Sequence, residues 1–327
     1  MKHIKLRTQM IHTPMAGLAL AIASLGWGWD HVMPVQGFQM GCSLVASALL
    51  LMLVAKFLSH PKHLLEDLAH PVVGSVVPTF AMATMVVAST LASRQAGLAN
   101  ALWLFAVVLH LTFLVLFSYH RSRQFKMADM VPSWFVPPVG IIVAALTCPQ
   151  PQFQPLATGL LYFGLACYAV LLPLMVYRLL CCGSLPTAAK PTFAIMAAPA
   201  SLALAGYLSI IEQPNPAVLY LLLPLALAMT ALLYLAFFSL LRLPFSPGYA
   251  AFTFPTVIGA TALLKLSDYL QTLPQGQGVS QVLYQIGQVE LMIATAVVLY
   301  VAGHYLWDQI KHQRGFAARI MSELNQP

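Results

Sequence analysis

The chain has 327 residues, of which 60% are hydrophobic and 8% are charged, and its formal net charge is +7. Soluble domains carry about 25% charged residues, so this composition excludes a soluble globular protein and indicates an integral membrane protein. No stretch has the composition of a linker between domains, and residues 1–327 are therefore predicted to form a single transmembrane domain.

The expected membrane-spanning helices follow one another with short connections. A helix needs about 20 predominantly apolar residues to cross the hydrocarbon core of a bilayer. By this criterion we predict an all-α integral membrane fold with ten spanning helices, over residues 14–29, 36–58, 72–92, 97–119, 133–148, 155–180, 191–211, 216–241, 248–266 and 281–306. The spanning region then covers residues 14–306, between short N- and C-terminal tails.

The basic residues predict the orientation of these helices. Of the 16 lysines and arginines, all except Arg94 and Lys265 lie in the two tails or in the connections after the second, fourth, sixth and eighth helices. By the positive-inside rule these positions are cytoplasmic, and so are both termini. The asymmetry explains the positive net charge without a nucleic-acid partner.

Prolines recur at a fixed phase in the odd-numbered helices. The leading prolines of these helices are 57, 61, 59 and 56 residues apart, and they are Pro14, Pro71, Pro132, Pro191 and Pro247. Four of the helices carry a second proline six to eight residues later, and these are Pro78, Pro138, Pro199 and Pro255. The first helix has Gly17 instead. The even-numbered helices are bulky apolar runs, so the period corresponds to one helical hairpin, as in a repeat architecture.

Five parallel hairpins predict a quasi-five-fold arrangement around a central pore. Small residues let the odd-numbered helices approach closely, and a carbonyl freed by a proline is tolerated where a lumen hydrates it. We therefore expect the pore to be lined by Gly17, Pro78, Pro138, Pro199 and Pro255 and sheathed by the even-numbered helices. The alternative is that these prolines are the ordinary background of transmembrane helices, but that background does not explain their common phase.

The expected lining carries no acidic residue. The odd-numbered helices contain no Asp or Glu between their first proline and their outer end. Because cation pathways usually present rings of carboxylates, the pattern favours anions over cations and leaves a neutral solute open.

The spans offer little catalytic chemistry. The sequence has no HExxH motif, no histidines four residues apart and no Ser/His/Asp grouping, so we expect neither an enzyme nor a bound metal or cofactor. Glu290 is the only carboxylate well inside a predicted span. An ionisable residue at this depth is a candidate functional residue. Alternatively, Glu290 has a structural role and pairs with Lys265 or with a hydroxyl group.

Four segments resemble the tellurite-resistance/dicarboxylate transporter family, which includes the plant guard-cell slow anion channels. They read "HPVVGSVVPTFAMATM", "PSWFVPPVGIIVAALT", "KPTFAIMAAPASLALAGYL" and "AAFTFPTVIGA", and the resemblance extends from Pro14 to Trp307. It implies five hairpins in quasi-five-fold order, assembled as a homotrimer with one pore per protomer. It also implies small anions as the transported species and a multi-pass protein of the plasma membrane, which is the inner membrane in a bacterium.

The resemblance further implies that a phenylalanine of the ninth helix closes the pore. The motif "FTFP" places this role on Phe254, with Phe252 as the alternative register. The first helix departs from the family pattern, because Thr13 precedes Pro14 where relatives often have glycine. The expected function is a gated anion channel or uniporter. The alternative is a proton-coupled carrier or exporter for tellurite, sulfite or a dicarboxylate such as malate, with Glu290 as the titratable group.

Overall fold

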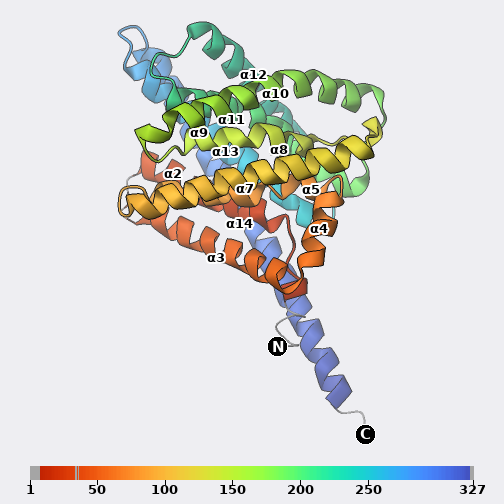
Figure 1. Cartoon of the computed structure of the whole chain (residues 1–327). Coiled ribbons are helices and arrows are strands. Elements are labelled where there is room, and N and C mark those ends of the chain that lie inside the picture. The colour runs from red at the N-terminus through yellow and green to blue at the C-terminus, as the bar shows by residue number, and fades with distance from the viewer. Residues whose placement is uncertain (1–7, 34, 36, 325–327) are drawn as a thin grey trace.

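The computed structural model describes the backbone of residues 8–33, 35 and 37–324, and the side chains as far as His312. Within this part of the chain every regular element is a helix (Figure 1). Most of the predicted N-terminal tail (residues 1–7) and the last three residues of the C-terminal tail lie outside the described residues. The long helix α14 (Gln277–Leu324) extends beyond the other helices, on the side where α4 (Pro61–Ala69) lies.

Eight described segments are long and apolar enough to cross a membrane. Five of them are single long helices, α3 (Phe38–Ser59), α7 (Ala96–Arg123), α10 (Gln154–Cys181, preceded by the 3-10 turn η4, Pro151–Phe153), α12 (Pro216–Leu240) and α14. The other three are composite, namely α5 with α6 (Val73–Val76 and Thr79–Leu91), η5 with α11 (Thr187–Ala197 and Ala198–Ile210) and η6 with α13 (Pro247–Phe252 and Thr253–Gln271).

Two of the ten predicted spans give shorter helical segments. The helix α2 (Met15–Val32) has 18 residues and ends in a polar stretch that contains Asp30 and His31, and it is not among the eight. The fifth predicted span is an apolar segment over Pro132–Leu146, built from η2 (Pro132–Phe135), α8 (Val136–Val139), η3 (Gly140–Ile142) and α9 (Val143–Leu146). The structure therefore supports eight spans, and ten spans in five hairpins stay a prediction.

Burial separates the membrane segments into an inner and an outer group. In the three composite segments, 78–89% of the residues in the most apolar window are buried, whereas in the five single long helices only 28–33% are. The outer helices present large apolar side chains on their exposed face, such as Leu58, Tyr220 and Leu235. We call the composite segments, α2 and Pro132–Leu146 the inner segments; they correspond to the odd-numbered helices of the sequence.

The second prolines of the repeat lie at the starts of regular helices. Pro78 is the N-cap of α6, Pro199 is the second residue of α11 and Pro255 is the third residue of α13. The first N–H groups of a helix have no partner within it, so a proline there costs no intrahelical hydrogen bond. The sequence suggested kinks within continuous helices; instead, 3-10 segments precede α11 and α13, and the prolines mark the transition.

Two glycines allow outer and inner helices to approach across Ile142. A Cβ added to Gly164 of α10 would lie 2.4 Å from Cγ1 of Ile142, and one added to Gly206 of α11 would lie 2.5 Å from its Cγ2. Ile142 is fully buried. Only glycine, which has no side chain, lets the backbone come this close to Ile142. The two helices therefore enclose the Ile142 side chain on two sides.

Replacing Gly164 by alanine should destabilise the protein, because the new methyl group would overlap Ile142. Overpacking of this kind costs about 1–3 kcal/mol, more than the roughly 0.5–1 kcal/mol that alanine gains over glycine within a helix. Gly159→Ala is the matched control in the same helix, since nothing lies within 4 Å of its added Cβ. Thermal unfolding in detergent should show a lower melting temperature for Gly164→Ala only. An unchanged value would contradict the close packing around Ile142.

Candidate functional site

All five inner segments line one cavity of about 660 Å³, which we call the central cavity. Its wall includes residues of α2, of α5 and α6, of η2 to η3, of η5 and α11, and of η6 and α13. The outer helices contribute one lining residue, Lys56 of α3. The repeat in the sequence therefore corresponds to a set of segments that share one enclosed space.

The central cavity is open at one end and closed at the other. In four of the five inner segments the lining runs along the chain from exposed or half-exposed residues to buried ones. The exposed lining residues, which include His70 and Ala188, define the mouth. The last lining residues of these segments, the inner end, are all buried, and they are Leu20, Met82, Leu202 and the pair Phe254–Pro255.

Three of the five predicted pore residues line this cavity. Gly17, Pro199 and Pro255 are part of its wall. Pro78 and Pro138 are not, although the residues that follow them, Thr79 and Val139, are. The structure thus brings together residues from the corresponding position of all five segments, but at the second and third segments the residue after the proline faces the cavity.

The two phenylalanines of the "FTFP" motif have different surroundings. Phe254 lines the inner end of the central cavity. Phe252 is fully buried away from it, with its ring 5.6 Å from that of Phe237 in an edge-to-face contact and 4.8 Å from that of Tyr249. Of the two registers considered from the sequence, only the one with Phe254 places a ring against the cavity.

The wall beyond the mouth is apolar, and its hydroxyl groups are already engaged. Thr79 donates to the carbonyl of Val76 at 2.6 Å, and Thr192 donates to the carbonyl of Ala189 at 2.6 Å. These hydroxyl hydrogens are used within the wall, so they are not free to hold a bound solute.

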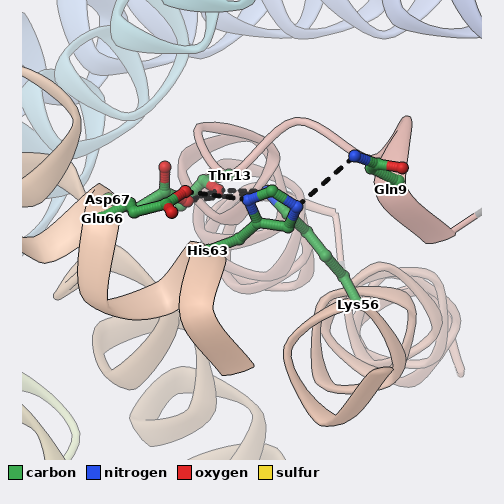
Figure 2. A network of polar contacts seen from close by, with 6 residues as sticks. All are labelled: Gln9, Thr13, Lys56, His63, Glu66 and Asp67. Atoms are coloured by element: carbon green, nitrogen blue, oxygen red, sulfur yellow. Dashed lines mark hydrogen bonds and ion pairs between the residues drawn. The ribbon is translucent and has the colours of Figure 1, made fainter. Parts of the chain in front are cut away.

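Charged residues gather at the mouth, as Figure 2 shows. The Lys56 ammonium donates to Oγ1 of Thr13 at 2.7 Å, and Thr13 in turn donates to Oδ2 of Asp67 at 2.5 Å. The Lys56 Nζ and the same carboxylate oxygen are 3.6 Å apart. Lys56 is buried, so this pairing compensates a cation that has lost most of its water. Beside this network, His63 contacts Glu66 at 3.0 Å.

The sequence analysis did not identify this network. It considered only the odd-numbered helices as lining, whereas Lys56 belongs to α3 and Asp67 to α4, a nine-residue helix that was not predicted. Thr13 is 43 residues from Lys56 and 54 residues from Asp67 in the chain. The available signal was a lysine near the end of an apolar run, "LMLVAKFLSH", which is ordinary for a membrane helix.

Glu290 and Lys265 do not form the pair that the sequence suggested. Glu290, on α14, is buried, and its Oε2 has no hydrogen-bond partner among the described residues. A Cβ added to Gly259 of α13 would lie 2.9 Å from this oxygen, so the carboxyl group rests against the α13 backbone. The Lys265 ammonium lies instead 4.7 Å from the centre of the Trp27 ring, a cation–π contact that holds it near the helix end.

A second cavity, of about 480 Å³, lies at the opposite end of α13. Its lining includes Lys265 and Asp268 of α13 and the end of α11. Residues 256–264, which separate the two groups of lining residues on α13, are all buried. Along this helix the two cavities are therefore separated by a closed section that begins just after Phe254.

Comparisons with known proteins agree with this architecture. A family model described as voltage-dependent anion channel matches residues 11–306. Two uncharacterized transporters of Methanocaldococcus jannaschii are 29% identical over 182 residues and 26% identical over 178 residues, which are 51% and 50% of this chain. The chain spans about half the length of these curated relatives, 52% and 50%.

Asp67→Asn should lower the free energy of unfolding by about 1–3 kcal/mol, because it leaves the buried Lys56 ammonium without its carboxylate. Adding Lys56→Met to this variant should recover part of the loss. Glu66→Gln is the control in the same helix; its exposed pair with His63 should contribute no more than about 0.5 kcal/mol. Chemical or thermal unfolding in detergent measures all three. Equal losses for Asp67→Asn and Glu66→Gln would refute a stabilising role for the mouth network.

Proposed function

Since the chain belongs to the voltage-dependent anion channel family, we propose that it is a gated channel or uniporter for small anions whose pathway is the central cavity. The observation that carries this proposal is the common lining of one cavity by all five inner segments. A pathway between repeats needs such convergence, whereas packed helices without a transport role do not. In this proposal the chain is one transmembrane domain of five hairpins and ten spanning helices around that pathway.

Phe254 is proposed as the barrier. Its ring lies at the inner end, where the lining stops and the buried section of α13 begins. A ring in a narrow apolar constriction blocks ions by its size and by excluding water. The other side chains of the inner end, Leu20, Met82, Leu202 and Pro255, are smaller than that of Phe254, so removal of the Phe254 ring would widen the constriction most.

The direction of the inner segments favours anions. Four of the five begin toward the mouth, so the positive ends of their helix dipoles point toward the cavity and its mouth. Asp67 is the only carboxylate of the described lining, and Lys56 neutralises it. A cation therefore meets no unpaired carboxylate in this described wall, while an anion meets the positive ends of the helix dipoles.

The proposed orientation rests on the positive-inside rule, and the proposed membrane and oligomeric state rest on the family resemblance. Lys56, Lys62 and Lys190 all lie in the chain segments around the mouth, which supports a cytoplasmic mouth and cytoplasmic termini in this proposal. We propose a multi-pass protein of the plasma membrane, the inner membrane in a bacterium. A homotrimer with one pore per protomer is proposed from the resemblance.

A proton-coupled carrier or exporter, for tellurite, sulfite or a dicarboxylate, is the second candidate because of Glu290. This buried carboxyl group has a free oxygen directly against Gly259, one turn beyond Phe254 and Pro255 on α13. A change of charge there acts on the helix that carries the proposed barrier. Coupling needs a titratable group of this kind close to the pathway.

Phe254→Ala should raise anion conductance strongly over a nearly silent wild type, with cations still excluded, because the ring is removed and the rest of the lining is unchanged. Phe252→Ala is the matched control two residues away; it empties a packed site next to Phe237 and Tyr249 without reaching the cavity. Currents in planar bilayers at equal amounts of protein, with anion and cation gradients, measure both.

Two results would contradict the barrier proposal. Currents that rise in Phe252→Ala and not in Phe254→Ala would assign the barrier to the other register. If both variants are silent while gel filtration shows intact protein, the barrier is not a phenylalanine of this motif.

Glu290→Gln distinguishes the channel from the carrier. The substitution keeps the size of the side chain and removes its charge, so in the Phe254→Ala background a channel should retain its anion current and its independence of a proton gradient. Proteoliposomes with an imposed pH difference and radiolabelled or fluorescent anion uptake provide the measurement. Uptake that is driven by the pH difference and abolished by Glu290→Gln would establish the carrier instead.

A further inference from the structure

Two histidines and an aspartate from opposite ends of the chain meet beside the mouth. Nε2 of His12, in the segment before α2, lies 3.1 Å from Oδ2 of Asp308 on α14. Nε2 of His312, one turn further along α14, lies 3.5 Å from Oδ1 of the same carboxylate. Each residue offers one possible ligand atom, a histidine nitrogen or a carboxylate oxygen, and these three atoms lie within 4.8 Å of one another. We call these three residues the His–Asp cluster.

These separations match those of a metal site. Zinc binds histidine nitrogen at about 2.0–2.1 Å and carboxylate oxygen at about 2.0–2.2 Å, so neighbouring ligand atoms of a tetrahedral site are roughly 3.4 Å apart. The His12 and His312 nitrogens lie 3.1 Å and 3.5 Å from the two different oxygens of Asp308, and with one ligand atom per residue the three atoms lie within 4.8 Å of one another. Both histidines present Nε2, a common metal-binding nitrogen, to the same carboxylate. Only small side-chain movements are needed to place the three atoms around one ion.

Two contacts of Tyr305 position α14 and His12 beside the cluster. Tyr305, one turn before Asp308 on α14, is buried and donates to the carbonyl of Pro247 at 2.6 Å. The His12 ring packs edge to face against Tyr305, with 6.5 Å between ring centres. This contact fixes His12 over α14. The side chains of His12, Asp308 and His312 are partly exposed, so an ion can reach them from solvent.

We propose that His12, Asp308 and His312 form a binding site for one divalent transition-metal ion of the Zn²⁺ type, with the fourth position open to water. Two imidazoles and one carboxylate suit Zn²⁺ and other divalent first-row transition metals, whereas Mg²⁺ and Ca²⁺ prefer all-oxygen sites. A bound ion would link the segment before α2 to α14. Because His12 also lines the central cavity, the ion would lie at the edge of its mouth.

The sequence could not reveal this site. His12 and Asp308 are 296 residues apart. The only local signal is an Asp–His pair at positions 308 and 312, which on a helix surface is ordinarily an ion pair. The two histidines become neighbours only when α14 passes the start of α2.

The test is a titration of the full chain with Zn²⁺. Protein prepared without a histidine tag, in detergent, is studied by isothermal calorimetry and by thermal unfolding. Wild type should bind one Zn²⁺ per chain and gain melting temperature, since a ligand that binds the folded state stabilises it. Excess Mg²⁺ should not compete. His12→Ala and His312→Ala should each lower the affinity by more than about tenfold, because even outer-shell partners contribute about 10–100-fold.

His120→Ala is the matched control. His120 lies at the end of α7, where its ring contacts Tyr119, and it forms no ion pair with any described residue. The Zn²⁺ affinity of this variant, and the rise in its melting temperature on Zn²⁺ binding, should equal those of wild type. Melting of the metal-free variants checks that they are folded. Wild-type affinity in both His12→Ala and His312→Ala, loss of binding in His120→Ala, or no stoichiometric Zn²⁺ binding by the wild type would each overturn the proposal.

Discussion

Within a membrane every backbone N–H and C=O must find a partner inside the protein, because lipid offers none. This requirement governs how the inner segments can carry so many prolines. By lying at the starts of α6, α11 and α13, Pro78, Pro199 and Pro255 occupy positions where no intrahelical bond is lost. The 3-10 segments η5 and η6 supply the bonds before them. These three segments can therefore line a cavity without the loss of an intrahelical hydrogen bond at their second prolines.

The same arrangement separates the tasks of the two helix groups. The outer helices expose apolar side chains on one face, while the inner segments are almost wholly buried and provide most of the cavity wall. Charge is confined to the mouth, where Lys56, Thr13 and Asp67 bond to one another. A path with paired charges at its entrance, an apolar wall and an aromatic ring at its inner end suits weak and brief binding of an anion, which fast conduction requires.

Periodic features were predictable from the sequence, and contacts between distant elements were not. The apolar runs predicted the membrane helices, and the regular spacing of the prolines indicated the segments that line the cavity. Both are patterns that can be read along the chain. The family resemblance placed the barrier role on Phe254 with Phe252 as the alternative register, and the structure adds that Phe254 lines the cavity while Phe252 is not part of its wall. The mouth network was missed because it joins Thr13, α3 and α4. Of the two partners considered for Glu290, Lys265 packs on Trp27 instead, a contact between distant elements that the sequence pattern does not reveal.

Covalent modification inside the cavity tests most directly whether anions pass through it. In Phe254→Ala protein with its five cysteines replaced, a single cysteine at Ala251, in the cavity wall, should react with a negatively charged methanethiosulfonate reagent. The reaction should then abolish most of the anion current. A cysteine at Ala262, buried in α13 of the same composite segment, should leave the current unchanged. Complete modification at position 251, verified by mass spectrometry, with an unaltered current would contradict the account, because ions would then take another route.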